Sequence, residues 1–318
     1  MATITTDFRL AVATLSEGDV VAIPTETVYG LAGNIYNEKA IRKIYSLKQR
    51  PLFNPLIVHV GSVQKVHELV SYFPDAAKKL ADAFWPGPLT IVLPKKAVVP
   101  DLITAGKSSV AIRIPNHPVT LELLQKLPFP LAAPSANKFG NISPTQSAHV
   151  ESAFKTELSL ILEGGSCASG IESTIIGFEN NLPVIYRLGA LSVEDLEAVI
   201  GPLPVKNKNA VAPEAPGMLE RHYAPITKTY FTDDVDALIR EFQDKKIGLM
   251  TFTEKQSKKY VAHHIVLSKC GNFKEAAAHL YKALHELDRL DLDLIIVEKF
   301  PDINLGRSIN DRLMRASK

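Results

Sequence analysis

The sequence predicts an α/β protein with two domains. Short apolar runs typical of buried strands alternate with segments of helical periodicity along most of the chain. At 318 residues, the chain is long enough for two hydrophobic cores. The stretch from about 202 to 225 interrupts the pattern, and its proline, alanine, lysine and asparagine content is typical of a linker. We therefore expect one domain at 1–203, a linker or lid at 204–226 and a second domain at 227–318.

The elements of the first domain follow from apolar spacing and from helix-capping residues. We expect strands at 19–23, 56–60, 89–93, 110–114, 131–133, 158–162, 173–178 and 184–188, and helices at about 5–18, 37–50, 62–73, 77–84, 118–127, 146–154 and 192–201. Thr5 or Thr6 is able to cap the first helix and Asn37 the second, and Ser192 forms a capping-box-like pair with Asp195. Because strands and helices do not alternate regularly, we expect a mixed, twisted sheet with flanking helices.

The second domain has a simpler pattern. Strands are expected at 227–231, 247–252, 264–267 and 294–297, with helices near 234–243 and 273–290. This pattern predicts a small three-layer α/β domain of the Rossmann-like kind.

Composition excludes few classes of function. A net charge of +2 does not require a nucleic-acid partner, although 36 basic residues leave room for a local basic patch. Cys167 and Cys270 lack metal-ligand spacing and are expected to be free thiols. The first residues do not resemble a signal peptide, and no apolar run approaches membrane-spanning length. We expect a cytoplasmic protein with no membrane association.

The stretch 23–33 is the one around which the chain is organised. Pro24 is expected to end the strand at 19–23, and Thr25, Glu26 and Thr27 follow at once. Hydroxyls and a carboxylate at the end of a buried strand are well placed to hold a polar ligand. The alternative is a turn whose threonines cap the next helix.

Cations and a histidine occur at similar places. Lys48 and Arg50 are expected near the end of a helix, where they would either interact with the helix dipole or hold an anion. Arg113 lies among apolar strand residues and needs an anionic partner, from the protein or from a substrate. His59 lies within a strand and is by itself a weak signal.

Three polar loops add hydroxyls, amides and backbone N–H groups. They lie at 134–137, 140–145 and 164–174. The last is rich in glycine and serine, which suits phosphate binding but also a flexible hairpin connection. Standard nucleotide-binding motifs are absent, and the histidines lack zinc-site spacing, so no structural metal is expected.

Taken together, these segments resemble the threonylcarbamoyl-adenylate synthases, the YrdC-like family. The blocks that carry the resemblance are Ile23–Leu31, Lys48-x-Arg50-Pro51-x-x-Asn54-Pro55-Leu56, Trp85–Thr90, Ala133–Asn137, Ser173–Ile175 and Arg187–Gly189, in that order. Ala215–Met218 and Arg221–Pro225 resemble the linker of the long, two-domain form. Glu163 stands where many relatives have aspartate, and Ser109 where threonine is common.

The resemblance implies an activity and a set of site residues. The family joins L-threonine, bicarbonate and ATP into threonylcarbamoyl-AMP, which other proteins transfer to an adenosine of tRNA. The implied threonine-binding residues are Thr27, His59, Arg113, Ala133 and Ser173. The implied ATP-binding residues are Arg50, Asn54, Ser109, Ser135, Ser143, Arg187 and Tyr223, and the implied catalytic residues are Lys48, Arg50, Ser135 and Asn137.

The implied chemistry needs no covalent enzyme intermediate. The deprotonated amine of threonine attacks bicarbonate or an activated form of it, and the carbamate then displaces pyrophosphate from ATP. Mg²⁺ is expected with the triphosphate, without protein side chains as its ligands. The linker is expected to act as a lid that excludes water.

Other functions compete with this interpretation. The same cations would serve a non-catalytic double-stranded RNA or tRNA-binding module, whose binding would depend strongly on salt. A carbamoyl-phosphate-using domain would carry zinc-finger cysteines that this chain lacks. A regulatory protein is disfavoured by the intact substrate residues. Downstream threonylcarbamoyl-transferase proteins are the expected partners, with a weak tRNA contact possible.

Overall fold

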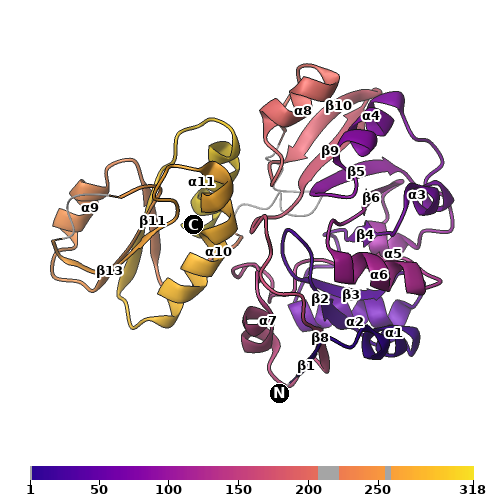
Figure 1. Ribbon diagram of the computed structural model, residues 1–318, viewed down its shortest axis with the longest axis horizontal. Helices are drawn as coiled ribbons and strands as arrows, with labels where there is room; N and C mark the ends of the chain where they lie inside the picture. The colour runs from indigo at the N-terminus through magenta and orange to yellow at the C-terminus, as the bar shows by residue number, and fades with distance from the viewer. Residues whose placement is uncertain (1, 207–221, 255–258) are drawn as a thin grey trace.

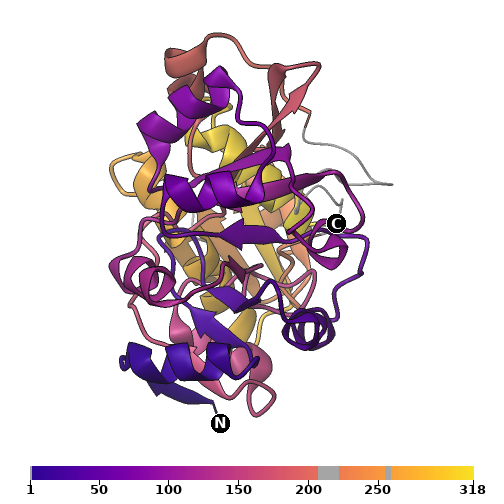
Figure 2. The same cartoon turned by 90° about the vertical axis from the view of Figure 1, so that its right-hand side faces the viewer.

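The computed structural model describes residues 2–206, 222–254 and 259–318. They form two α/β domains, each built on its own sheet (Figure 1). Figure 2, turned by 90°, has the C-terminal domain behind the N-terminal one. The expected linker at 204–226 falls mostly outside the described residues, as do Ala215–Met218 and Arg221 of the linker motif.

The N-terminal domain is built on a ten-stranded sheet in the order β1-β8-β2-β3-β7-β4-β6-β5-β9-β10. The strands are β1 (Thr3–Thr5), β2 (Val21–Ile23), β3 (Gly30–Asn34), β4 (Ile57–His59), β5 (Leu89–Pro94), β6 (Ser109–Arg113), β7 (Leu131–Ala132), β8 (Leu160–Leu162), β9 (Thr174–Glu179) and β10 (Leu182–Arg187). Parallel pairs such as β4–β6 adjoin antiparallel pairs such as β4–β7, so the expected mixed sheet is confirmed.

Helices cover both faces of this sheet. They are α1 (Phe8–Ser16), α2 (Glu38–Lys48), α3 (Val63–Leu69), α4 (Asp75–Phe84), α5 (Asp101–Thr104), α6 (Pro118–Lys126), α7 (Ser147–Phe154) and α8 (Val193–Ile200). Helices α1 and α6 pack on one side of the sheet, and α2, α3, α4 and α8 belong to the larger core on the other. The expected Asn37 cap and the Ser192–Asp195 capping box are both present.

Three local expectations were wrong or incomplete. Helix α1 begins at Phe8 and is capped by Asp7, because Thr5 is held in β1, a strand that was not expected. Strand β3 was also not expected, since Gly30 and Gly33 weaken its strand propensity. It forms because β2 and β7 supply hydrogen-bonding partners on both sides. The short helix α5 was missed as well.

The C-terminal domain has three layers, as expected. Its parallel sheet has the order β11-β14-β12-β13, with β11 (Thr229–Thr232), β12 (Ile247–Thr251), β13 (Val261–Val266) and β14 (Leu294–Glu298). Helix α9 (Val235–Glu241) packs on one face of the sheet. Helices α10 (Phe273–Arg289) and α11 (Leu305–Ala316) pack on the other, on the side toward the N-terminal domain (Figure 1).

Helix α11 was not expected, because much of its buried surface is polar. Asn310, Asp311, Arg312 and Arg315 are all buried, so the apolar stripe that marks an amphipathic helix is narrow. Among the helices that the structure describes, none has the length and apolar character needed to cross a membrane. Both cysteines are free thiols, Cys167 buried and Cys270 exposed.

Candidate active site

A cleft lies where the middle strands of the N-terminal sheet meet the polar loops and residues 222–223. Its walls bring together residues that are far apart in the chain. The lining residues are Thr25, Thr27, Val28, Gly30, Arg50, Ile57, His59, Arg113, Ala133, Pro134, Ser135, Glu172, Ser173, Arg187, His222 and Tyr223. All five expected threonine-binding residues line this one cleft.

Arg113 lies at the end of β6 and is almost fully buried. Its Nη1 donates to Thr27 Oγ1 over 2.8 Å, and its Nε donates to the carbonyl of Gly87. Its Nη2 lies 2.7 Å from Glu26 Oε1, an ion pair without hydrogen-bond geometry. The protein therefore supplies a charge partner for Arg113, and the guanidinium keeps hydrogen-bonding capacity that a substrate carboxylate can use.

His59 is the register partner of Arg113 on the neighbouring strand. Burial and the positive charge of Arg113 lower the pKa of His59 to about 3, so the imidazole is neutral at pH 7. The tautomer protonated on Nδ1 donates to the carbonyl of Ile57, 3.3 Å away. Nε2 is then a hydrogen-bond acceptor for a ligand in the cleft.

Arg50 follows the left-handed residue Gln49 that ends α2, and it is held by a local network. Its guanidinium donates to Asn54 Oδ1 over 2.5 Å and to the carbonyls of Asn54 and Pro55. Burial lowers the pKa of Arg50 to about 10, which still leaves it charged at pH 7. Asn54 orients Arg50 and does not itself line the cleft.

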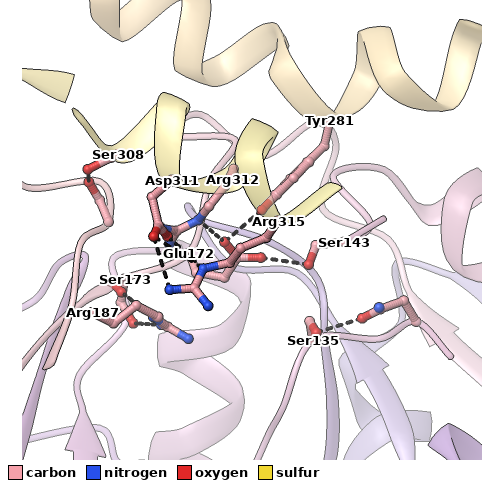
Figure 3. Close-up of polar contacts among 12 residues, drawn as sticks. Ser135, Ser143, Glu172, Ser173, Arg187, Tyr281, Ser308, Asp311, Arg312 and Arg315 are labelled. Atoms are coloured by element: carbon pink, nitrogen blue, oxygen red, sulfur yellow. Dashed lines mark hydrogen bonds and ion pairs between the residues drawn. The ribbon is translucent and has the colours of Figure 1, made fainter. Parts of the chain in front are cut away.

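Lys48 is buried behind the cleft and does not line it. Its Nζ donates to the carbonyl of Ser135 (2.5 Å), to the carbonyl of Asn137 (2.7 Å) and to Asn137 Oδ1 (3.4 Å). Ser135 Oγ donates to the same Asn137 Oδ1 over 2.6 Å (Figure 3). Lys48 and Asn137 thus hold the loop that presents Ser135 to the cleft.

Arg187 and Ser173 form another part of the cleft lining. Arg187 Nη2 donates to the carbonyl of Ser173 (2.7 Å) and to its Oγ (3.0 Å) (Figure 3). Ser173 Oγ also lies 2.7 Å from Thr90 Oγ1. Tyr223 has a positive φ of 64° and is fully buried, with no hydrogen-bond partner for its hydroxyl among the described residues.

Three expected ATP-binding residues do not line this cleft: Asn54, Ser143 and Ser109. Ser143 is buried and donates to Glu172 Oε1 over 2.6 Å, so it acts on the cleft wall through Glu172. Ser109 begins β6, four residues before Arg113, and lines a separate hollow with Tyr72, Asn180 and Tyr186. The structure does not bring Ser109 to the other site residues.

Glu26, Glu172 and His222 were not assigned as site residues from the sequence. Glu26 lies in the stretch 23–33, and its position next to Thr27 was the signal that could have identified it as a site residue. Glu172 precedes Ser173, but two of its three partners, Tyr281 and Arg312, are 109 and 140 residues away. No local pattern indicates such contacts.

The part of the chain that the structure describes buries nine side-chain charges of Lys, Arg, Asp and Glu. Six are cations, Lys48, Arg50, Arg113, Arg187, Arg312 and Arg315, and three are carboxylates, Glu26, Glu172 and Asp311. Three of the cations, Arg50, Arg113 and Arg187, line the cleft beside one of the carboxylates, Glu172, so the lining suits an anionic ligand. In the same described residues, no group of three or more His, Cys, Asp or Glu side chains is arranged to hold a metal ion.

A histidine pair joins the two domains beside Ser143. The rings of His149 on α7 and His285 on α10 are stacked with centroids 3.9 Å apart, and His285 Nε2 lies 3.2 Å from the carbonyl of Ser143. Burial lowers the pKa of His149 to about 3 and that of His285 to about 4. Both therefore stay neutral in mild acid, where a histidine with the ordinary pKa of 6.5 becomes protonated.

This pair predicts a loss of stability in mild acid. The unfolded chain binds protons at these histidines near pH 6.5 and the folded chain only near pH 3–4, so folded stability falls as the pH drops through that window. Thermal unfolding at a series of pH values is expected to show a midpoint that decreases below pH 6.5, and less steeply in His285→Gln. The same change at the partly exposed His263 is the control and should leave the slope unchanged. Equal slopes in all three proteins would contradict the assignment.

The fold and the cleft define a two-domain α/β protein whose mixed sheet carries a cleft lined by buried cations. A family model described as "Telomere recombination" matches residues 13–189, and one described as "Threonylcarbamoyl-AMP synthase, C-terminal domain" matches residues 191–318. The chain belongs to the threonylcarbamoyl-AMP synthase family, in its two-domain form.

Relatives named threonylcarbamoyl-AMP synthase match nearly the full length of this chain. The threonylcarbamoyl-AMP synthase of Bacillus subtilis is 40% identical over 96% of this chain and 92% of its own length. The threonylcarbamoyl-AMP synthase of Pyrococcus abyssi is 39% identical over 97% of this chain and 93% of its own length. A crystal structure of P. abyssi Sua5 complexed with L-threonine superposes with a TM-score of 0.91 at 38% identity, covering 98% of this chain and 94% of that one.

Proposed function

We propose that this protein condenses L-threonine, bicarbonate and ATP into threonylcarbamoyl-AMP and pyrophosphate, for the threonylcarbamoyladenosine modification of tRNA. The observation that carries the proposal is the cleft itself. One wall joins Arg113, Thr27 and neutral His59, and another joins Arg50, Ser135 and Arg187. An amino-acid site and a phosphate site thus share a single space, as a condensation of the two requires.

The threonine site is the side nearer β4 and β6. Arg113 binds the carboxylate of threonine through hydrogen-bonding capacity that its ion pair with Glu26 leaves open. His59 Nε2 accepts a hydrogen bond from the ammonium or the hydroxyl group. Thr27, Ser173 and the backbone of Ala133 complete the pocket. The low pKa of His59 makes it an acceptor rather than a base that stores the amine proton.

The nucleotide site is the side nearer Arg50 and Arg187. Their guanidiniums meet the phosphates, and Ser135 Oγ lies beside them on the loop that Lys48 and Asn137 hold. Tyr223 presents on the same side a hydroxyl that has no hydrogen-bond partner among residues 2–206, 222–254 and 259–318. When bound with ATP, Mg²⁺ would neutralise part of the triphosphate charge, and Arg50 and Arg187 would meet the remainder.

The reaction then proceeds by two displacements. The free amine of threonine forms a C–N bond with the bicarbonate carbon, and one oxygen leaves as water. A carbamate oxygen next attacks the α-phosphorus of ATP, the bond to the β-phosphate oxygen breaks, and pyrophosphate leaves. The preorganised cations around the cleft stabilise the charge that develops during the second step.

Pyrophosphate release from ATP tests this proposal. The assay uses degassed buffer, with threonine and bicarbonate each present or omitted and with serine as a substitute. Release that needs both compounds, and that is poor with serine, is the expected result. Release with neither would identify a nucleotide hydrolase, and no release combined with salt-dependent tRNA binding would favour the RNA-binding alternative.

A further inference from the structure

Glu172 connects the cleft to the C-terminal domain. It lies in the loop before β9 and lines the cleft beside Ser173. Its Oε1 accepts from Ser143 Oγ (2.6 Å), while its Oε2 accepts from the hydroxyl of Tyr281 (2.9 Å) and from Arg312 Nε (3.1 Å) (Figure 3). One oxygen therefore faces the N-terminal domain, and the other is held by α10 and α11.

Two residues of α10 make contacts with Glu172 and Ser143 from the C-terminal side. Tyr281 and His285 are four residues apart on α10, so they lie on one face of the helix. Tyr281 reaches Glu172, and His285 reaches the carbonyl of Ser143. The C-terminal domain thus contacts Ser143 directly at its backbone and through Glu172 at its side chain.

Arg312, like Tyr281 and Ser143, has no exposed surface. Its Nη1 donates to Asp311 over 3.1 Å, and its Cζ lies 5.3 Å from the centroid of the Tyr223 ring. Burial opposes the ionisation of Glu172, but the charges of Arg312 and Arg187 outweigh it and lower the pKa of that carboxyl. Arg312 therefore keeps a negative charge fixed at the wall of the cleft.

The backbone permits this close approach at Gly170, in the same loop. A Cβ atom at Gly170 would lie 2.4 Å from the Cα of Ala278 on α10. Only a residue without a side chain lets the loop reach the helix here. The loop that carries Glu172 is consequently docked on α10 at two points, Gly170 and Glu172.

We propose that Glu172 is a positioning residue through which the C-terminal domain orders the nucleotide side of the cleft. Arg312 and Tyr281 set the orientation of its carboxylate, which in turn fixes the hydroxyl of Ser143. This inference rests on the proposed function. Among the described residues, the hydrogen bonds and ion pairs of Thr27, His59 and Arg113 all stay within the N-terminal domain, so their action is independent of the connection.

The test compares Arg312→Gln and Tyr281→Phe with Ser308→Ala. Ser308 lies on the same face of α11, is equally buried, and crosses the same interface by donating to the carbonyl of Gly189, but it does not touch Glu172. Pyrophosphate release gives kcat and the KM values for ATP and threonine, and thermal unfolding gives the stability of each variant.

We expect Arg312→Gln to raise the KM for ATP about tenfold, a size usual for coupling between sites, with the KM for threonine within about threefold. Tyr281→Phe should show the same pattern at smaller size, and Ser308→Ala should keep both KM values. A merely structural role would instead lower the active fraction, so all three variants would lose Vmax and Tm with unchanged KM values. If Arg312→Gln does not fold, Tyr281→Phe carries the test, because it removes one hydroxyl only.

A double-mutant cycle adds a second criterion. Since Arg312 acts through Glu172, Glu172→Gln combined with Arg312→Gln should raise the KM for ATP no more than the worse single variant. Additive effects, or a KM for ATP in both Arg312→Gln and Tyr281→Phe equal to that of Ser308→Ala, would overturn the inference. A wild-type protein that releases no pyrophosphate would contradict the proposed function instead, so the two failures are distinct.

Discussion

Arg113→Ala is expected to weaken threonine affinity by about 100-fold or more, because it removes the cation that meets the substrate carboxylate. It also leaves Glu26 buried without its charge partner, 2.7 Å from where the guanidinium was. ATP binding should be nearly unchanged, since the threonine and nucleotide sides of the cleft are distinct. Isothermal titration with threonine and with a non-hydrolysable ATP analogue measures both.

The matched control for this change is Arg42→Ala. Arg42 is an exposed arginine on α2 whose partner is Glu38, one turn away. Its loss should alter neither ligand affinity, because exposed ion pairs contribute little. Threonine affinity that is equal in Arg113→Ala and in the wild type would show that the carboxylate binds elsewhere.

Lys48→Met is expected to lower kcat by about 100-fold while threonine affinity changes by less than about threefold. The ammonium holds the carbonyls of Ser135 and Asn137, and methionine fills similar space without donating to them. A loop displaced by about 1 Å at a reacting site is enough for a loss of this size. Two buried carbonyls also lose their donor, at about 1–3 kcal/mol each, so the Tm should fall.

Lys43→Met separates this effect from a general effect on α2. Lys43 lies on the same helix and pairs with Asp19 at a partly exposed position. Its change should leave kcat intact. If Lys48→Met kept normal turnover, the loop that carries Ser135 would not depend on Lys48, and its assigned role would be wrong.

Local rules predicted much of the fold. The Asn37 cap, the Ser192–Asp195 capping box and Pro118 at the first turn of α6 are contacts within a few residues, and all three are present. Strand β3 and helix α11 were missed because partners distant in sequence stabilise them. Pairing with β2 and β7 supports a strand with two glycines, and the domain interface buries a helix rich in polar residues.

The site residues likewise divide into those that the sequence could indicate and those that depend on distant partners. Arg113 and Arg50 could be singled out from the sequence, because a cation in a strand or beside a helix end needs an anion. The indirect roles of Lys48 and Asn54 could not, since each depends on which carbonyl or guanidinium the fold brings near. The contacts of Glu172 with Tyr281 and Arg312 span 109 and 140 residues, far beyond any motif. Ser109 was grouped with the cleft by resemblance alone, and the structure places it in another hollow.

The most direct test of the central claim follows the carbon of bicarbonate. The protein is incubated with ATP, threonine and ¹³C-bicarbonate, and the nucleotide products are separated and weighed by mass spectrometry. We expect a product that contains AMP, threonine and one ¹³C atom, in amounts equal to the pyrophosphate released. An unlabelled adduct of AMP and threonine would mean that the carboxylate of threonine attacks ATP without bicarbonate, and would contradict the assignment of three reactants to this cleft.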